Sequence, residues 1–297
     1  MRKINSYFED VPLDLIDAVN KLDFPNQSDE VKSAIYGKAK PKLMEIYRHK
    51  CAYCEIDIAG GAPYHVEHYR PKGNKNHKND YPDFTGYFWL GYEWTNFLLV
   101  CPYCNTKKSD TFPLKLEGKR VKQPPEDING TVIFNIEDSL YKDEDPLLLH
   151  PVLDGNEIGK HIYFKQNGEI ESLSDKGKKS IECYGLNRNY LTSKRAELIT
   201  ESIQKQIIYE YLRKRKPLSI DEIDDELEKI ISKLKNDIKF EKETFIAFRA
   251  TILNNFSEFV IKNKVILKAG EKEIEIPQKD LWLKCVEEKL NKHLKKD

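Results

Sequence analysis

The sequence predicts an α+β protein: a small core framed by cysteines, a short sheet appended to it, and helices on its flanks. Three observations support this fold class. Two C-x2-C pairs lie at residues 51–54 and 101–104, and a hairpin pattern follows at residues 162–171. Residues 189–297 carry apolar side chains at helical spacing, as helices with one buried face do.

The two cysteine pairs are Cys51 with Cys54, and Cys101 with Cys104. Four thiolates in two such knuckles match the tetrahedral ligand set of zinc, and four protein ligands leave no open position for a substrate. We therefore expect one structural Zn2+. A redox C-x-x-C is the alternative, but it would explain one pair and not two. Disulfides or two unrelated turns are the remaining interpretation.

Polar side chains suited to acid–base chemistry or metal binding lie between and just after these pairs. The stretch that contains His65, Glu67 and His68 alternates like a short strand, which places His65 and Glu67 on one face. Asn96 lies in the loop before the second cysteine pair. Asn105 follows that pair, where a helix is expected to begin.

This order of strand, loop and helix resembles the HNH (ββα-metal) nucleases. Glu67–His68 is similar to the family's Asp–His pair, Asn96 to its middle asparagine, and Asn105 to its last ligand. Glu67 and Asn105 replace a commoner Asp and His, but both offer oxygen ligands, which suit Mg2+, with Mn2+ as the alternative. His65 is a further candidate ligand of that ion.

The resemblance extends to the PtuB-type HNH proteins, which are effectors of the Septu antiphage system and also occur beside retrons. It covers about residues 35–195 and leaves the outer helices out. It implies an ATPase partner of the PtuA type and a hetero-oligomer. The segments that carry it are Cys51–Glu55, His65–Lys72, Asp145–Pro151 and Tyr184–Arg188.

The resemblance implies hydrolysis of phosphodiester bonds that leaves 5′-phosphate and 3′-hydroxyl ends. In this interpretation His68 is the general base, because a neutral imidazole is available near pH 7. Glu67 and Asn105 hold one Mg2+ at the scissile phosphate. Asn96 ties its loop to the strand and fixes the ring of His68.

Four basic residues next to this set are expected to contact the phosphate backbone of the substrate without reading its sequence. They are Arg70, Lys72, Lys107 and Lys108. DNA is the favoured substrate, and cleavage of RNA such as a tRNA by the same site is the alternative. A second alternative is a non-catalytic, zinc-stabilised nucleic-acid-binding or adaptor protein, against which the intact set of site residues argues.

Composition limits what the chain does alone. Its 297 residues include 49 basic and 49 acidic side chains, so the formal net charge is zero. This counts against strong unaided binding of nucleic acid, and we expect weak activity without a partner. The chain has no Walker motif, so an ATPase must be another subunit. No apolar run is long enough for a membrane span and no signal peptide is visible, which predicts a cytoplasmic protein with Cys183 and Cys285 as free thiols.

The outer elements have local signals of their own. Helices are expected over residues 12–21 and from Pro41 towards the first cysteine pair. Residues 131–136 have strand character, the hairpin turns at Asn167–Gly168, and Ser219 with Glu222 forms a capping box. We expect N-terminal helices packed on the core in residues 1–50, the nuclease core in 51–115, a small β-containing extension in 130–188, and helices that could offer a partner surface in 189–297.

Overall fold

The computed structural model describes residues 1–20, 25, 28–58, 63–75, 83–241, 243–262, 265–266 and 273–293. It is a mixed helix-and-strand protein, as the α+β class predicts, with three two-stranded sheets among these residues. The chain divides into two compact units. The first comprises Met1–Tyr163 and Glu171–Leu186, and the second comprises Phe164–Ile170 and Asn187–Asp297.

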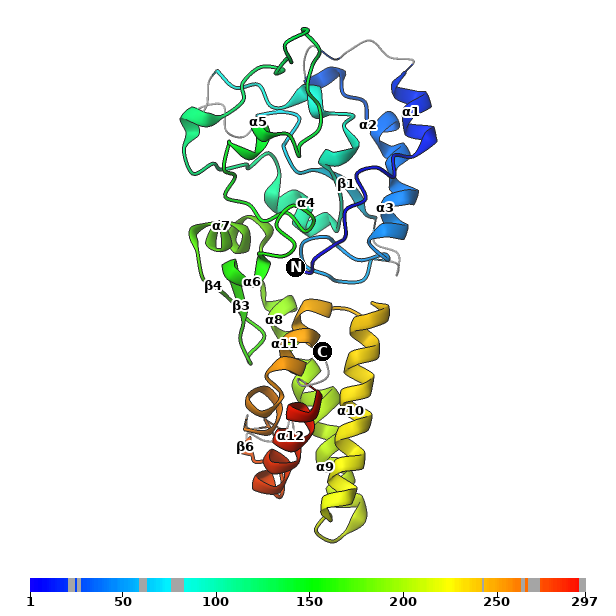
Figure 1. Ribbon diagram of the computed structural model, residues 1–297, viewed down its shortest axis with the longest axis vertical. Coiled ribbons are helices and arrows are strands. Elements are labelled where there is room, and N and C mark those ends of the chain that lie inside the picture. Colours follow the sequence, from blue (N-terminus) through cyan, green and yellow to red (C-terminus); the bar gives the residue numbers. More distant parts are fainter. Residues whose placement is uncertain are drawn as a thin grey trace. The chain divides into compact units, whose positions relative to one another are not determined.

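Short helices and turns build the first unit (Figure 1). Its α-helices are α1 (Leu13–Val19), α2 (Ser33–Tyr36), α3 (Lys40–Ile46), α4 (Pro102–Lys108), α5 (Ser139–Lys142), α6 (Ile158–His161) and α7 (Asp175–Tyr184). Its 3-10 helices are η1 (Ser28–Glu30), η2 (Gly37–Ala39), η3 (Phe88–Leu90), η4 (Trp94–Asn96) and η5 (Glu117–Lys119). Its central strands are β1 (His65–His68) and β2 (Phe97–Val100).

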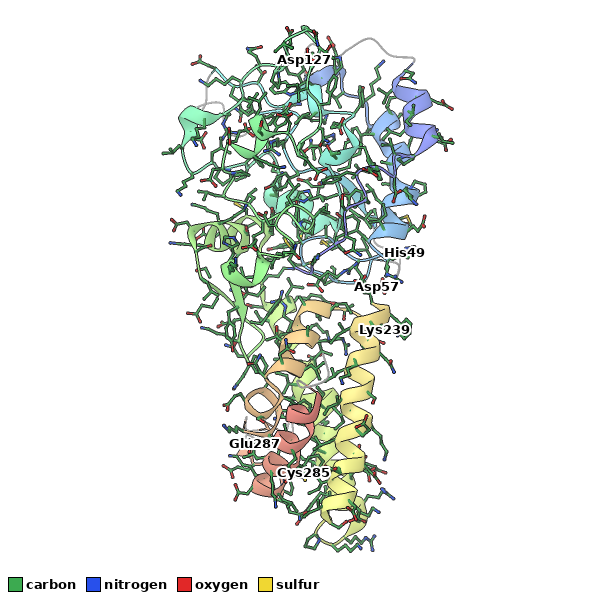
Figure 2. All side chains as sticks on the ribbon, viewed as in Figure 1. His49, Asp57, Asp127, Lys239, Cys285 and Glu287 are labelled. Carbon is green, nitrogen blue, oxygen red and sulfur yellow. The ribbon has the colours of Figure 1, made fainter. Side chains whose placement is uncertain are left out.

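The two helices expected before the first cysteine pair are present as α1 and α3. Pro41 lies in the first turn of α3, where its missing N–H costs no hydrogen bond. This helix ends at Ile46, and His49 then adopts a left-handed φ of 56° before the cysteine loop. Figure 2 labels His49 and Asp57 at the two ends of that loop, which the amide of Ile58 closes by donating to the carbonyl of His49.

Strands β1 and β2 pair antiparallel, with His65 opposite Val100 and His68 opposite Phe97. All four residues of β2 are buried, and α4 packs on β1. The sequence suggested that this helix begins at Asn105, but it begins at Pro102. Proline presets the first helical φ, and Cys101 Sγ caps the helix by accepting from the amide of Cys104.

The extension keeps one of its two expected strand features. Strands β3 (Ile162–Phe164) and β4 (Ile170–Ser172) form the expected hairpin, with Gly168 at a φ of +82° in its turn. The strand expected at 131–136 is wrong: only Val132 bridges to Glu126. Two of its backbone groups form hydrogen bonds with side chains instead of with a second strand. The Thr95 hydroxyl accepts from the amide of Ile136, and the Tyr141 hydroxyl donates to the carbonyl of Ile133.

The second unit is mainly helical. The capping box at the start of α10 is confirmed, since Ser219 and Glu222 each accept from the other's backbone amide. The apolar stripe of α10 is buried, and the helix packs against α11 and α12. Its α-helices are α8 (Asn189–Glu197), α9 (Lys205–Lys214), α10 (Ile220–Phe240), α11 (Ile246–Asn254) and α12 (Lys279–His293). Two π-helices, η6 (Leu198–Gln204) and η7 (Ser257–Ile261), and the strands β5 (Val265–Ile266) and β6 (Glu273–Ile274) complete it.

None of the six cysteines, all within the described residues, forms a disulfide, as expected for Cys183 and for Cys285, which Figure 2 labels on α12. Among the residues that the structure covers, no helix has both the length and the apolar character needed to cross a membrane.

His150 is buried in the first unit with a neutral ring. Its Nδ1 accepts from the amides of Val152 and Leu153, each at 3.2 Å. Burial, together with the positive charges of Arg70 and Lys176, lowers its pKa to about 3. Protonation would therefore break two hydrogen bonds and place a third cation among buried side chains.

We expect this histidine to make the protein acid-sensitive. The unfolded chain binds a proton below the ordinary histidine pKa of about 6.5 and the folded chain does not, so stability is lost as pH falls. At pH 5 the loss is about 2 kcal/mol from this residue. Chemical denaturation at pH 7 and pH 5 should show a shallower fall in the free energy of unfolding for His150→Asn than for wild type. Equal falls would contradict the prediction.

Candidate active site and metal centre

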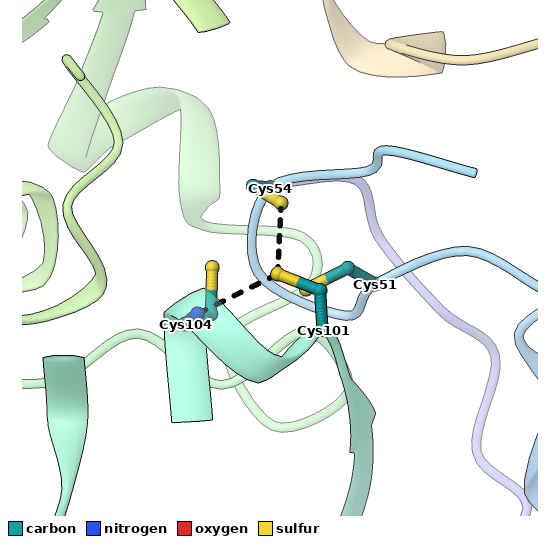
Figure 3. A group of neighbouring side chains, drawn as sticks. All are labelled: Cys51, Cys54, Cys101 and Cys104. Carbon is teal, nitrogen blue, oxygen red and sulfur yellow. Dashed lines mark hydrogen bonds between the residues drawn. The ribbon is translucent and has the colours of Figure 1, made fainter. Parts of the chain in front are cut away.

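Figure 3 shows the four cysteines of the two knuckles brought together from the loop after α3 and from the start of α4. Their sulfur atoms all lie within 4.8 Å of one another, and Cys54 Sγ is 3.9 Å from Cys101 Sγ. A tetrahedral zinc with Zn–S bonds of about 2.3 Å needs sulfurs about 3.8 Å apart. All four cysteines are buried, so this cluster could hold a structural zinc ion.

Within the cluster the hydrogen bonds favour a thiolate at Cys101, whereas burial raises the pKa of Cys51 and a hydrogen bond with Cys101 raises that of Cys104. The pKa of Cys101 is lowered by hydrogen bonds from the other three thiols, Cys104 foremost. The first knuckle is also tied to the central sheet, because the amide of Ala52 donates to the carbonyl of Leu99 in β2 at 2.8 Å. The cluster therefore joins two distant chain segments directly beside the β1–β2–α4 unit.

His68 lies at the end of β1 with its ring buried and its orientation fixed. Its Nε2 is 2.9 Å from the carbonyl oxygen of Gly91. The rings of Tyr36 and Phe97 pack edge-on against it, with ring centroids 4.8 and 5.1 Å from that of His68. A carbonyl only accepts, so Nε2 carries the hydrogen, and no described residue hydrogen-bonds to Nδ1. Burial lowers the pKa of His68 to about 4, which keeps the ring neutral at pH 7.

Asn96 is fully buried and braces the segment that holds His68. Its Oδ1 accepts from the amide of Arg70 at 2.8 Å, and its Nδ2 donates to the carbonyls of Arg70 and Leu90 at 3.0 and 3.4 Å. Leu90 precedes Gly91, whose carbonyl accepts from His68. The side chain of Asn96 thus joins the end of β1 to the turn that orients the histidine ring.

Glu67 points to the other face of β1, towards α4. Its Oε1 is 2.6 Å from Nζ of Lys108, and both side chains are buried. Burial raises the pKa of Glu67, and Lys108 opposes this effect. The same Nζ donates to the carbonyl of His68 at 3.1 Å, so one lysine contacts both residues of the Glu67–His68 pair.

His65 and Asn105 meet beside Glu67. The distance from Asn105 Nδ2 to His65 Nδ1 is 3.4 Å, and both side chains are half-buried. Burial lowers the pKa of His65, as does the nearby Lys40. Glu67, Asn105 and His65 thus offer one carboxylate, one amide oxygen and one imidazole; oxygen ligands suit a hard divalent cation such as Mg2+, whereas an imidazole is more typical of softer metals.

An open cavity of about 470 Å³ brings these groups to the surface. Two aspartates and one tyrosine in its wall were not singled out from the sequence. Asp29 and Asp110 add carboxylates, and Tyr36 packs on the ring of His68. The site residues that line the cavity are His65, Glu67, His68, Lys72 and Asn105.

The four predicted phosphate contacts lie in different surroundings. Arg70 is only 1% exposed, and its Nε is 2.8 Å from Glu144 Oε2, so its guanidinium is a structural group and not a surface contact. Lys108 is 0% exposed and held by Glu67. Lys72 lines the cavity, and Lys107 is exposed on α4 without lining it. The expectation of direct phosphate contact therefore fits Lys72 best.

Two curated relatives are similar to most of this chain. Septu protein PtuB of Bacillus mycoides (strain KBAB4) is 31% identical over 244 residues, which cover 77% of this chain and 76% of that protein. Septu protein PtuA of the same strain is 28% identical over 230 residues, which cover 76% of this chain and 27% of that protein. The chain thus spans about a quarter of the length of that PtuA protein. No protein-family model matches the chain, and no solved structure matches it significantly.

Proposed function

Because this chain belongs to the Septu PtuB family, we propose that it is a metal-dependent endonuclease of the HNH type, acting in antiphage defence with a PtuA-type partner. The similarity to PtuB supports the role in the Septu system. The arrangement of β1, β2 and α4 supports the nuclease.

One observation carries the proposal: a neutral, oriented histidine beside a cavity that also contains Glu67 and Asn105. The hydrogen bond from Nε2 of His68 to Gly91 leaves Nδ1 as the basic nitrogen. A base held in one orientation beside oxygen ligands is what hydrolysis of a phosphodiester requires. The cavity is open, so a nucleic-acid backbone can approach it.

In the proposed reaction Nδ1 of His68 takes a proton from the water that attacks phosphorus. The ring then carries a positive charge, which the carbonyl of Gly91 stabilises by accepting from Nε2. Asn96 keeps that carbonyl in place through Leu90. Lys72, half-buried at the cavity wall, would hold a phosphate of the substrate.

A Mg2+ ion bound there would neutralise the charge that builds up on phosphate during the reaction. Glu67 and Asn105 are its proposed ligands, with His65 as a third, and Mn2+ is the alternative ion. Their chemistry fits such an ion, because two of the three supply oxygen atoms. The zinc proposed at the four cysteines would be separate and structural, since a fully protein-ligated zinc offers no position to a substrate.

The second unit is the proposed site for the PtuA-type partner, which the family resemblance implies to be an ATPase. None of the proposed catalytic residues lies in this unit. Its surface carries the exposed apolar side chains of Tyr209 and Leu212 next to the basic run Arg213–Lys216. Exposed aromatic side chains and arginines are enriched at protein interfaces, which supports a partner surface here.

The test is an assay of the purified chain on plasmid DNA and on total RNA, with Mg2+ or EDTA, alone and mixed with the PtuA-type protein. We expect Mg2+-dependent cleavage of DNA that becomes faster when the PtuA-type protein is added. We also expect the two proteins to co-elute on size exclusion. Cleavage of RNA alone would support the same active site but show that RNA, and not DNA, is the substrate. A chain that binds zinc and its partner but cleaves neither polymer would indicate an adaptor.

A further inference from the structure

Lys108 lies in an unusual place for a surface helix. It is the last residue of α4, yet it is 0% exposed, whereas its neighbour Lys107 is exposed. Its Nζ is 2.6 Å from Oε1 of Glu67 and 3.1 Å from the carbonyl oxygen of His68. A buried ammonium is costly unless it is paired and hydrogen-bonded, and these two contacts fulfil that need.

The geometry points to a positioning role. We propose that Lys108 holds one oxygen of Glu67 and the backbone of His68, so that the metal ligand and the base are set before any cation or substrate binds. This inference rests on the proposed nuclease function. It replaces the direct phosphate contact that the sequence suggested, because a fully buried ammonium does not reach a substrate.

The contact also limits how Glu67 can bind a metal. With Oε1 held by the ammonium, Oε2 is the oxygen left for a cation, so Glu67 would bind one through a single oxygen. Mg2+ and Mn2+ sites commonly use such single-oxygen carboxylates together with water, whereas Ca2+ takes more ligands and often both oxygens of a carboxylate. Lys108 therefore favours the smaller ions.

The experiment measures Mn2+ binding by electron paramagnetic resonance in wild type, Lys108→Met, Lys108→Arg and Lys107→Met, with Ca2+ as competitor. Loss of an outer partner of a ligand typically costs 10–100-fold in metal affinity or activity. We expect Lys108→Met to bind Mn2+ about 10-fold more weakly and to let Ca2+ compete better. Lys108→Arg should regain part of the affinity, and Lys107→Met should bind Mn2+ like wild type.

Cleavage kinetics separate this role from a phosphate contact. A positioning residue predicts that Lys108→Met lowers kcat and leaves the KM for DNA nearly unchanged. A raised KM with unchanged Mn2+ binding would overturn the proposal. If the wild type cleaves no nucleic acid, the nuclease proposal fails, while the Mn2+ titration still tests Lys108.

Folding is controlled with a second variant. Lys108→Met leaves Glu67 buried without its cation, so we expect its Tm to fall by several degrees. The double variant Lys108→Met, Glu67→Gln removes both charges and should recover part of that loss without recovering Mn2+ binding. If the Tm of the double variant is no higher than that of Lys108→Met, the interaction between Lys108 and Glu67 does not contribute to stability, and the proposed pairing is wrong.

Discussion

Replacing Cys101 with serine is expected to abolish zinc binding and to unfold the core of the first unit. Cys101 has three tasks: it contributes one sulfur to the four-cysteine cluster, directly follows β2, and caps α4. Structural zinc contributes about 10–16 kcal/mol in zinc-finger peptides. Whole domains are stable by only about 5–15 kcal/mol. Loss of a bound zinc ion would therefore remove more free energy of unfolding than the remaining contacts provide.

Metal analysis and thermal unfolding check this result. Wild type should contain one zinc per chain and lose its thermal transition when a strong chelator removes the ion. The matched control is Cys183→Ser, which changes a half-buried thiol of α7 outside the cluster and should keep both zinc and Tm. A zinc-free wild type, or a Cys101→Ser variant with the wild-type Tm, would show that the four cysteines serve another purpose.

The four-cysteine cluster could be predicted from sequence because the geometry of each half is local. Each C-x2-C turn places two sulfurs together whatever the rest of the fold does, and the repeat of the spacing leaves few other interpretations. The hairpin at Asn167–Gly168 and the capping box at Ser219 are local in the same sense. Elements whose partners lie within a few residues are the ones that sequence patterns describe well.

The burial of Arg70 and Lys108 could not be predicted, because their partners are distant in the chain. Glu144 lies 74 residues after Arg70, and the carbonyl of His68 lies 40 residues before Lys108. A cation beside a proposed active site looks like a phosphate contact until the fold shows a carboxylate facing it. The carbonyl of Gly91 has no sequence signature at all, since every residue carries that group.

Replacing His68 with alanine is expected to lower the rate of cleavage about 10²- to 10⁴-fold, the usual contribution of a general base. This corresponds to about 3–5 kcal/mol of transition-state stabilisation. The ring is held by Gly91 through Nε2, so its loss removes both the base and the fixed geometry. Cleavage rates should be compared at saturating substrate, with zinc content and Tm measured on the same samples.

The pH dependence of the wild-type rate tests the same residue in another way. A base with a pKa near 4 is unprotonated throughout the neutral range, so the rate should stay nearly constant from about pH 8 to pH 5 and fall below that. A histidine with the ordinary pKa of about 6.5 would already lose half of its activity at about pH 6.5. The rate profile thus distinguishes a buried base from an exposed one.

The control for His68→Ala is His49→Asn, because His49 is exposed, lies outside the cavity and has a left-handed φ that asparagine tolerates. We expect this variant to cleave at the wild-type rate.

If His68→Ala keeps the wild-type rate while its zinc and Tm are unchanged, the base is another group. His65 is then the remaining imidazole among the described residues that line the cavity. If His68→Ala loses cleavage but still co-elutes with the PtuA-type partner, catalysis and assembly depend on different parts of the chain. We expect the second result, because the ring of His68 is buried within the first unit and is not a surface contact.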